Sequence, residues 1–236
     1  MKKKILILLV ALLPLLSLSA YSDSWQKYDS LDWRALFSAI RNNRGSSEVE
    51  SLYSVYMKSS LTSVEKARAE YNMVRYYMDN GNEEKAKEHY ALQEADAAEC
   101  TGDDVLSRIA QAEVTASDYY ITKDMFTGME NSKHTKKLYE DFPDEVYIVL
   151  MNAWRLIYTP QIAGGSNKNA IRILTPLLDE TSSMCEENVY SLYGALATAY
   201  YNRHDYEESG EYLDKALRIY SGESALLELR EKLDKK

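Results

Sequence analysis

The chain has 236 residues, 28% of them charged, and a formal net charge of −9 at pH 7. The phosphates of a nucleic acid and the surface of an anionic membrane would repel so acidic a chain, which excludes both as partners. Only four prolines and nine glycines occur, and this composition favours helices.

The N-terminal residues have the order of a secretory signal peptide. Three lysines at positions 2–4 precede an apolar run over 5–16, and small residues follow. This order predicts a signal peptide over 1–22, cleaved after Ser19, Ala20 or Ser22, and a periplasmic or secreted mature chain of charge −12 once the lysines are lost. A bilayer-spanning helix needs about 20 apolar residues. A retained anchor is therefore the weaker alternative, and we expect no stable membrane insertion after cleavage.

The remaining sequence predicts helices joined by short turns, so that neighbours are antiparallel. Capping boxes, in which Ser or Thr precedes Glu by three residues, mark expected helix starts at Ser47, Thr62 and Ser183. No strand pattern of period two occurs. The expected helices are 31–43, 47–59, 62–80, 83–100, 103–122, 126–141, 145–159, 167–180, 184–202, 205–220 and 222–234.

Large and small side chains recur with one spacing in pairs of these helices. Small residues allow two helices to approach closely, and large ones fill the spaces between turns. The clearest copy has Tyr193, Leu196, Ala197 and Tyr200 on its first helix and Ser209, Leu213 and Ala216 on its second. Further copies cover 67–94, 146–178 and, in degenerate form, 112–145. Ala86, Ala153, Ala170 and Ala197 are the small residues that we expect at helix contacts.

This spacing resembles the tetratricopeptide repeat (TPR). The resemblance implies an all-α fold in which antiparallel helical hairpins stack as a TPR-like α-solenoid. We expect an N-terminal helical hairpin over 23–61, acting as a cap, and a TPR-like repeat domain over 62–236. An insertion over 158–170, with a Gly164–Gly165 pair, also resembles the T component of tripartite ATP-independent periplasmic transporters. The glycines suit either a tight bend beside a helix or an anion-binding loop, and the bend is favoured.

No motif for catalysis or metal binding stands out. His89, His134 and His204 lie in different predicted segments, and neither H-E-x-x-H nor C-x-x-C occurs. Acidic pairs such as Glu186–Glu187 fall at helix starts, where the helix dipole favours negative charge. Cys100 and Cys185 would lie in different repeats, so two free thiols are favoured over a disulfide. We therefore expect neither an enzyme nor a bound metal or cofactor.

The TPR resemblance implies a concave groove lined by the first helix of each hairpin. Aromatic and arginine side chains in such a groove are typical of binding hot spots. The function we expect is a non-enzymatic scaffold of the cell envelope that binds a protein or peptide partner in this groove. The alternative is a transporter accessory, similar to the T component, that binds a small apolar ligand or a substrate-binding protein. The candidate partner-binding residues are Tyr71, Arg75, Tyr120, Trp154, Tyr158, Tyr201 and Asn202.

Overall fold

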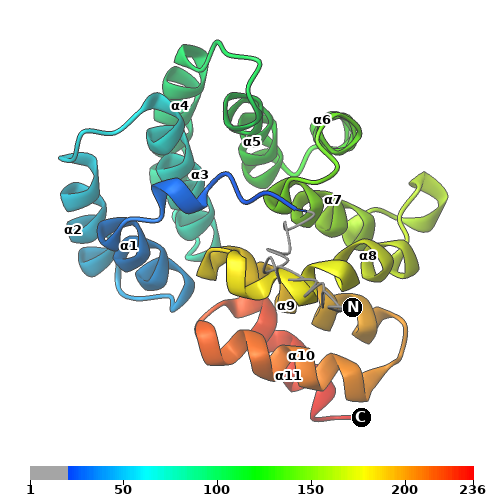
Figure 1. Ribbon diagram of the computed structural model, residues 1–236. Coiled ribbons are helices and arrows are strands. Elements are labelled where there is room, and N and C mark those ends of the chain that lie inside the picture. Colours follow the sequence, from blue (N-terminus) through cyan, green and yellow to red (C-terminus); the bar gives the residue numbers. More distant parts are fainter. Residues whose placement is uncertain (1–20) are drawn as a thin grey trace, which may run out of the picture.

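A computed structural model describes residues 21–236 of the chain, so the predicted signal peptide, except for its last two residues, lies outside the described part. The described residues form eleven α-helices, three short 3₁₀ segments and no β-strand (Figure 1). The all-α prediction is confirmed. The helices are α1 (Leu31–Arg41), α2 (Ser46–Met57), α3 (Ser63–Asp79), α4 (Glu83–Glu99), α5 (Val105–Thr122), α6 (Met125–Asp141), α7 (Val146–Tyr158), α8 (Asn167–Leu174), α9 (Glu186–Asn202), α10 (Tyr206–Ile219) and α11 (Ser224–Leu233), and the 3₁₀ segments are η1 (Gln26–Tyr28), η2 (Gln161–Ala163) and η3 (Thr175–Ser183).

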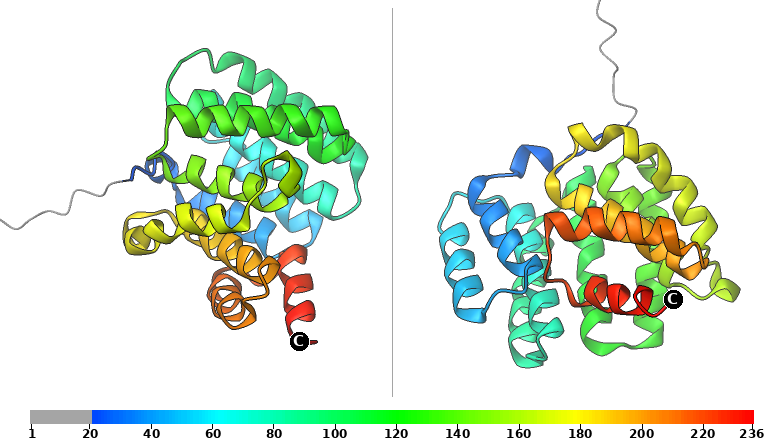
Figure 2. Two further views of the ribbon diagram at one scale, coloured as in Figure 1. Left: turned by 90° about the vertical axis from the view of Figure 1, so that its right-hand side faces the viewer. Right: turned by 90° about the horizontal axis from the view of Figure 1, so that it is seen from below.

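Consecutive helices pack as five hairpins, from α1–α2 to α9–α10, and α11 follows against α9 and α10. Contacts between hairpins connect α1 to α3, α3 to α5, α6 to α7 and α7 to α9. The first and last helices also meet, because buried residues of α1, α2 and α3 share one hydrophobic cluster with residues of α9, α10 and α11 (Figures 1 and 2). The hairpin predicted as an N-terminal cap therefore contacts both the next hairpin and the C-terminal helices.

A close backbone contact fixes this meeting of the two ends. The Asn42 side-chain oxygen accepts a hydrogen bond of 2.9 Å from the backbone N–H of Ser221. Beside it, a Cβ atom added to Gly222 would lie 2.2 Å from the carbonyl carbon of Asn42. Only glycine allows so close an approach of two backbones.

The small side chains expected at helix contacts are all buried. Ala86, Ala153, Ala170 and Ala197 have no solvent-exposed surface and lie within the two largest hydrophobic clusters. The hydroxyl of Ser209, which starts the second helix of the clearest repeat, donates to the carbonyl oxygen of Ala197 at 2.8 Å. Helix α9 therefore packs against α10 through small residues, as the spacing predicted.

One of the three predicted capping boxes is present in the structure. Thr62 and Glu65 form the box that begins α3. The Ser47 prediction was wrong, because α2 begins after Gly45 and Ser47 lies within the helix. The Ser183 prediction was also wrong, because α9 begins after Cys185. The expected helix over 167–180 ends as α-helix at Leu174 and continues as 3₁₀ turns, since Pro176 has no N–H to donate.

The Gly164–Gly165 pair shapes the connection between α7 and α8. Gly164 has a φ of +93°, and a Cβ atom on Gly165 would lie 1.7 Å from the carbonyl oxygen of Thr159. The next residue, Ser166, donates its N–H to Leu156 at 2.8 Å and caps α8 with its hydroxyl. The pair therefore makes the tight bend that the sequence favoured.

The contact between α9 and α10 can be tested with Ala197→Trp. An indole ring at this fully buried position overpacks the interface, so the free energy of unfolding should fall by about 1–3 kcal/mol. Urea denaturation followed by circular dichroism measures this change. The exposed Glu211→Trp on α10 is the matched control and should stay within about 0.5 kcal/mol of wild type. Equal stability of both variants would contradict the packing.

The bend before α8 can be tested with Gly165→Ala. The added methyl group collides with backbone, so we expect a loss of at least about 1–3 kcal/mol in the free energy of unfolding. Gly210→Ala in α10 provides the control, because nothing lies within 4 Å of the added atom. That variant should gain about 0.5–1 kcal/mol, since alanine favours a helix more than glycine does. Thermal melts of the two variants should therefore shift in opposite directions.

Candidate binding surface

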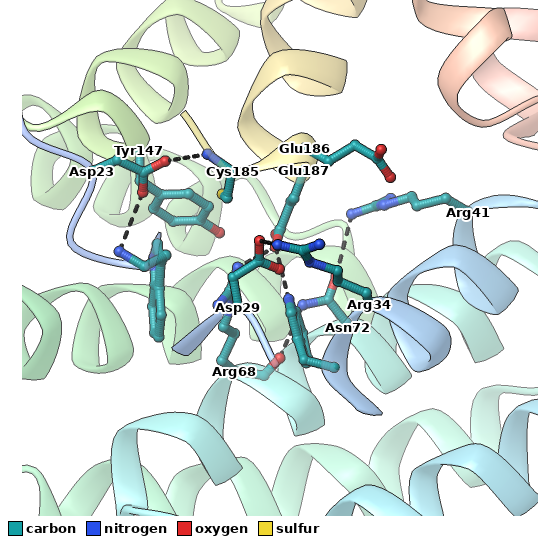
Figure 3. A network of polar contacts seen from close by, with 12 residues as sticks. Asp23, Asp29, Arg34, Arg41, Arg68, Asn72, Tyr147, Cys185, Glu186 and Glu187 are labelled. Carbon is teal, nitrogen blue, oxygen red and sulfur yellow. Dashed lines mark hydrogen bonds and ion pairs between the residues drawn. The ribbon is translucent and has the colours of Figure 1, made fainter. Parts of the chain in front are cut away.

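A buried arginine joins three parts of the chain. Arg68 of α3 is 2% exposed, and its guanidinium lies over the ring of Trp25 at 4.0 Å and over the ring of Trp33 at 4.2 Å. The same group donates to the carboxylate of Glu187 on α9, which also accepts the Trp33 indole N–H at 3.3 Å. Figure 3 shows Arg68 within a network of polar contacts that includes Glu187 and Asn72. A buried charge is tolerated only where it is paired, and two aromatic faces stabilise the cation further.

A carboxyl group lies near this arginine without a second partner. Glu113 of α5 is 1% exposed and accepts a hydrogen bond from the Tyr147 hydroxyl of α7 on one oxygen, while its other oxygen has no partner. Burial raises the pKa of Glu113 to about 8, against the hydrogen bond from Tyr147 and the positive charge of Arg68, which lower it. Glu113 is therefore largely protonated at neutral pH, and its free oxygen is a donor.

A second carboxylate holds the C-terminal helices to α1 and α3. Glu223, which precedes α11, lies 3.4 Å from the guanidinium groups of both Arg41 and Arg75 and accepts from the Tyr190 hydroxyl. Burial acts to raise the pKa of Glu223, but the two arginines outweigh it and the pKa is lowered. Two cations share one anion here, so a positive charge is left over at Arg75.

Five of the seven predicted residues lie on α3, α5 and α7, and we call these five the aromatic–arginine surface. The Arg75 guanidinium carbon lies 5.9 Å from the ring centre of Tyr71 and 5.8 Å from that of Tyr120. Trp154 and Tyr158 stack in parallel on α7 with ring centres 5.5 Å apart. The surface consists of Tyr71 and Arg75 from α3, Tyr120 from α5, and Trp154 and Tyr158 from α7.

Charges on α3 and at the start of α11 act on the α7 part of this surface. Burial raises the pKa of Tyr158, with Glu223 and Tyr120 raising it further and Arg75 lowering it. Tyr158 nevertheless remains 67% exposed, so solvent and partners can reach it. Trp154 is held in place by its indole N–H, which donates to Ser191 of α9 at 3.0 Å. All five side chains are at least partly exposed.

The other two predicted residues lie elsewhere. The ring of Tyr201 packs against Tyr206, with centres 5.5 Å apart, at the turn between α9 and α10. Asn202 donates to Asn167 at 3.3 Å and borders a polar surface hollow of about 520 Å³ between the start of α8 and this turn. His204 lies in the same hollow and is exposed, as the sequence suggested. The structure therefore separates Tyr201 and Asn202 from the aromatic–arginine surface.

Sequence reasoning missed the carboxylates that organise the interior. Glu113, Glu187 and Glu223 lie on or beside helices whose other charged residues are mostly exposed, so no local pattern marks them as buried. The Glu186–Glu187 pair lies in the first turn of α9, as predicted, but the helix-dipole argument did not anticipate that Glu187 is 8% exposed and pairs with Arg68. A glutamate within the apolar stretch of α5 is the one signal that could have pointed to Glu113.

Cys100 and Cys185 are free, buried thiols that belong to different hydrophobic clusters. Across residues 21–236, no group of three or more His, Cys, Asp or Glu side chains is placed to hold a metal ion. Within the same residues, no helix combines the length and the apolar character needed to cross a bilayer. No protein-family model, curated protein or solved structure matches the sequence.

The buried carboxyl group can be tested with Glu113→Gln. Because the folded-state pKa of about 8 exceeds the ordinary value of 4.5, the folded chain holds a proton that the unfolded chain releases between these pH values. The wild-type free energy of unfolding should therefore carry a contribution that falls with rising pH in this window, by at most about 1.4 kcal/mol per pH unit. The variant should lose this contribution and gain stability relative to wild type as the pH rises.

Urea denaturation at several pH values between about 5 and 8 measures the difference between the two proteins. Glu84→Gln, at an exposed position in the first turn of α4, is the matched control and should follow the wild-type curve. Parallel curves for wild type and Glu113→Gln would show that this group does not titrate abnormally.

Proposed function

We propose that the chain is a TPR-like helical-repeat scaffold that binds a protein or peptide partner through the aromatic–arginine surface. One observation carries the proposal: three successive hairpins contribute partly exposed aromatic side chains, with Tyr71 and Tyr120 beside Arg75 and Trp154 stacked on Tyr158. These are the residue types that dominate binding hot spots. Ordered antiparallel hairpins, buried alanines at the contacts of α4, α7, α8 and α9, and the repeat spacing support the TPR-like character.

The charges around this surface suit a segment that carries a carboxylate beside an apolar side chain. Arg75 shares the carboxylate of Glu223 with Arg41. Lys123, at the end of α5, places its ammonium 4.0 Å from the ring centre of Tyr120. Asp79 adds a second negative charge beside Tyr120, from whose hydroxyl it accepts a hydrogen bond of 3.1 Å. A carboxylate can pair with the cations, while Trp154 and Tyr158 offer apolar faces.

The proposal predicts that Tyr158→Ala weakens partner binding without unfolding the protein. The ring is mostly exposed, so its removal should change stability little, whereas truncation of a hot-spot residue costs at least about 2 kcal/mol of binding, or roughly 30-fold in Kd. A photo-crosslinking residue at the exposed position 161 in the full chain would identify the bound protein in cells. Titration of that purified protein then gives the Kd for wild type and variant.

Ile162→Ala is the matched control, because this side chain is fully exposed one turn beyond Tyr158 and makes no contact with the aromatic–arginine surface. It should bind as wild type does. A crosslinked protein that binds wild type and Tyr158→Ala equally would contradict the assignment of this surface.

The alternative, a transporter accessory that binds a small apolar ligand, uses the same stacked pair of aromatic rings. It predicts quenching or enhancement of the Trp154 fluorescence by apolar ligands in the absence of any protein partner. Trp154→Phe separates this signal from those of the two buried tryptophans, Trp25 and Trp33.

A further inference from the structure

The segment that precedes α1 lies against the starts of α7 and α9. In Figure 1 it runs from α1 towards α7, and the left view of Figure 2 shows it at one end of the helices. The backbone of Ser22 donates to Asp144 and accepts from Val146, both at 2.8 Å. The carboxylate of Asp23 accepts from the backbone N–H of Cys185 at 2.8 Å. This segment therefore contacts residues more than 120 positions away along the chain.

Polar atoms of the segment before α1 accept hydrogen bonds at the starts of two helices that lack a side-chain cap. The N-cap residues of α7 and α9, Glu145 and Cys185, make no side-chain capping bond, whereas Thr62 and Asp104 cap α3 and α5. Free N–H groups at a helix start need acceptors and attract negative charge. The Ser22 carbonyl and the Asp23 carboxylate supply these acceptors.

Because the side chain of Glu145 does not cap α7, it can bind the same segment instead. Its carboxylate accepts from the Ser22 hydroxyl at 2.8 Å and, on Ser24, from the backbone N–H at 3.0 Å and the hydroxyl at 2.8 Å. Glu145 is only 3% exposed, so these three bonds satisfy a buried carboxylate. The site thus recognises hydroxyl groups on both sides of an acid.

Trp25 anchors the segment with its whole side chain buried. Its ring lies 4.0 Å from the Arg68 guanidinium and meets the Tyr147 ring edge-on at 6.0 Å, within a cluster that includes Ile109 and Ile148. The indole N–H has no acceptor, although an unpaired buried donor costs about 1–3 kcal/mol. The fit of this anchor is therefore incomplete.

We propose that this end of the fold is a second recognition site, specific for a turn-forming segment in which an acid flanked by hydroxyl residues precedes a tryptophan by two positions. With the signal peptide cleaved after Ser19 or Ala20, two of the three predicted positions, the chain's own Ser22–Trp25 segment is its resident occupant, and a partner segment of the same chemistry competes for it. The site goes beyond the proposed function, because it uses Arg68, Glu145, Tyr147 and the starts of α7 and α9 rather than the aromatic–arginine surface.

The test weakens the binding of the resident segment by mutation in the full chain and adds the same segment as a separate peptide. In the double variant Asp23→Ala/Trp25→Ala, the resident loses its acid and its anchor. A fluorescent peptide with the sequence of residues 21–28 should then bind at least about 10-fold more tightly than it binds wild type, where the tethered resident competes at millimolar effective concentration. Fluorescence anisotropy gives both values. Asp32→Ala, at an exposed position on α1, is the control and should behave as wild type.

Two further peptides test specificity. Replacing the aspartate by asparagine, or the tryptophan by alanine, should each weaken binding to the vacated variant at least about 10-fold. Equal binding of all three peptides, or no binding to a variant whose helical circular dichroism is intact, would overturn the proposal and leave the segment a structural strap only. Tyr158→Ala should not change peptide binding, so failure here is distinguishable from failure of the proposed function.

If the double variant does not fold, Asp23→Asn keeps the anchor and removes only the charge of the capping acceptor. Hydrogen exchange of the backbone amides of residues 22–27 is then measured with and without excess unlabelled peptide. Faster exchange of these amides in the presence of peptide is expected, because the resident is displaced. Unchanged exchange at saturating peptide would contradict a replaceable occupant.

Discussion

The pairing of Arg68 with Glu187 is the interaction on which the arrangement of this molecule depends. It places two opposite charges in the interior, and the breaking of such a pair by loss of one partner costs about 3–5 kcal/mol, because the other charge is left buried and uncompensated. The pair joins α3 to α9, and the two tryptophans on the guanidinium add α1 and the N-terminal segment. A single cation therefore fixes where four parts of the chain lie relative to one another.

The same principle explains why the chain has 20 tyrosines and only 3 phenylalanines. Where helices of different hairpins meet, a tyrosine ring fills the apolar space while its hydroxyl donates to a carboxylate that water reaches poorly. A phenylalanine would fill the space but leave the carboxylate unsatisfied. This pairing recurs between Tyr53 and Glu70, Tyr147 and Glu113, and Tyr190 and Glu223. Tyr77 and Tyr220 donate in the same way to the more exposed Glu50 and Glu186.

The two ends of the hairpin array present different chemistry as a result. At the helix starts, Arg68 and the uncapped ends of α7 and α9 are already satisfied by Trp25 and Asp23 from the chain itself. Towards the helix ends, Arg75 and its aromatic neighbours remain partly exposed, with a positive charge that Glu223 balances incompletely. The surface that we propose for partner binding therefore lies at the second end, while the segment before α1 occupies the first.

The sequence by itself determined what depends on neighbours a few residues away. Periodicity, the Thr62–Glu65 box and the glycine bend before α8 each act within one or two turns, and the helices and buried alanines followed from them. The candidate residues on α3, α5 and α7 belong to adjacent hairpins, and Arg75 lies beside Tyr71 and Tyr120 while Trp154 stacks on Tyr158. Ser183 does not cap α9, because a distant residue takes that place. The acceptor at the start of α9 is the carboxylate of Asp23, which lies 162 positions before Cys185. Only the tertiary structure decided contacts between residues so far apart in the sequence. The packing of the first helices against the last ones determines which charged side chains are buried and which side chains they pair with.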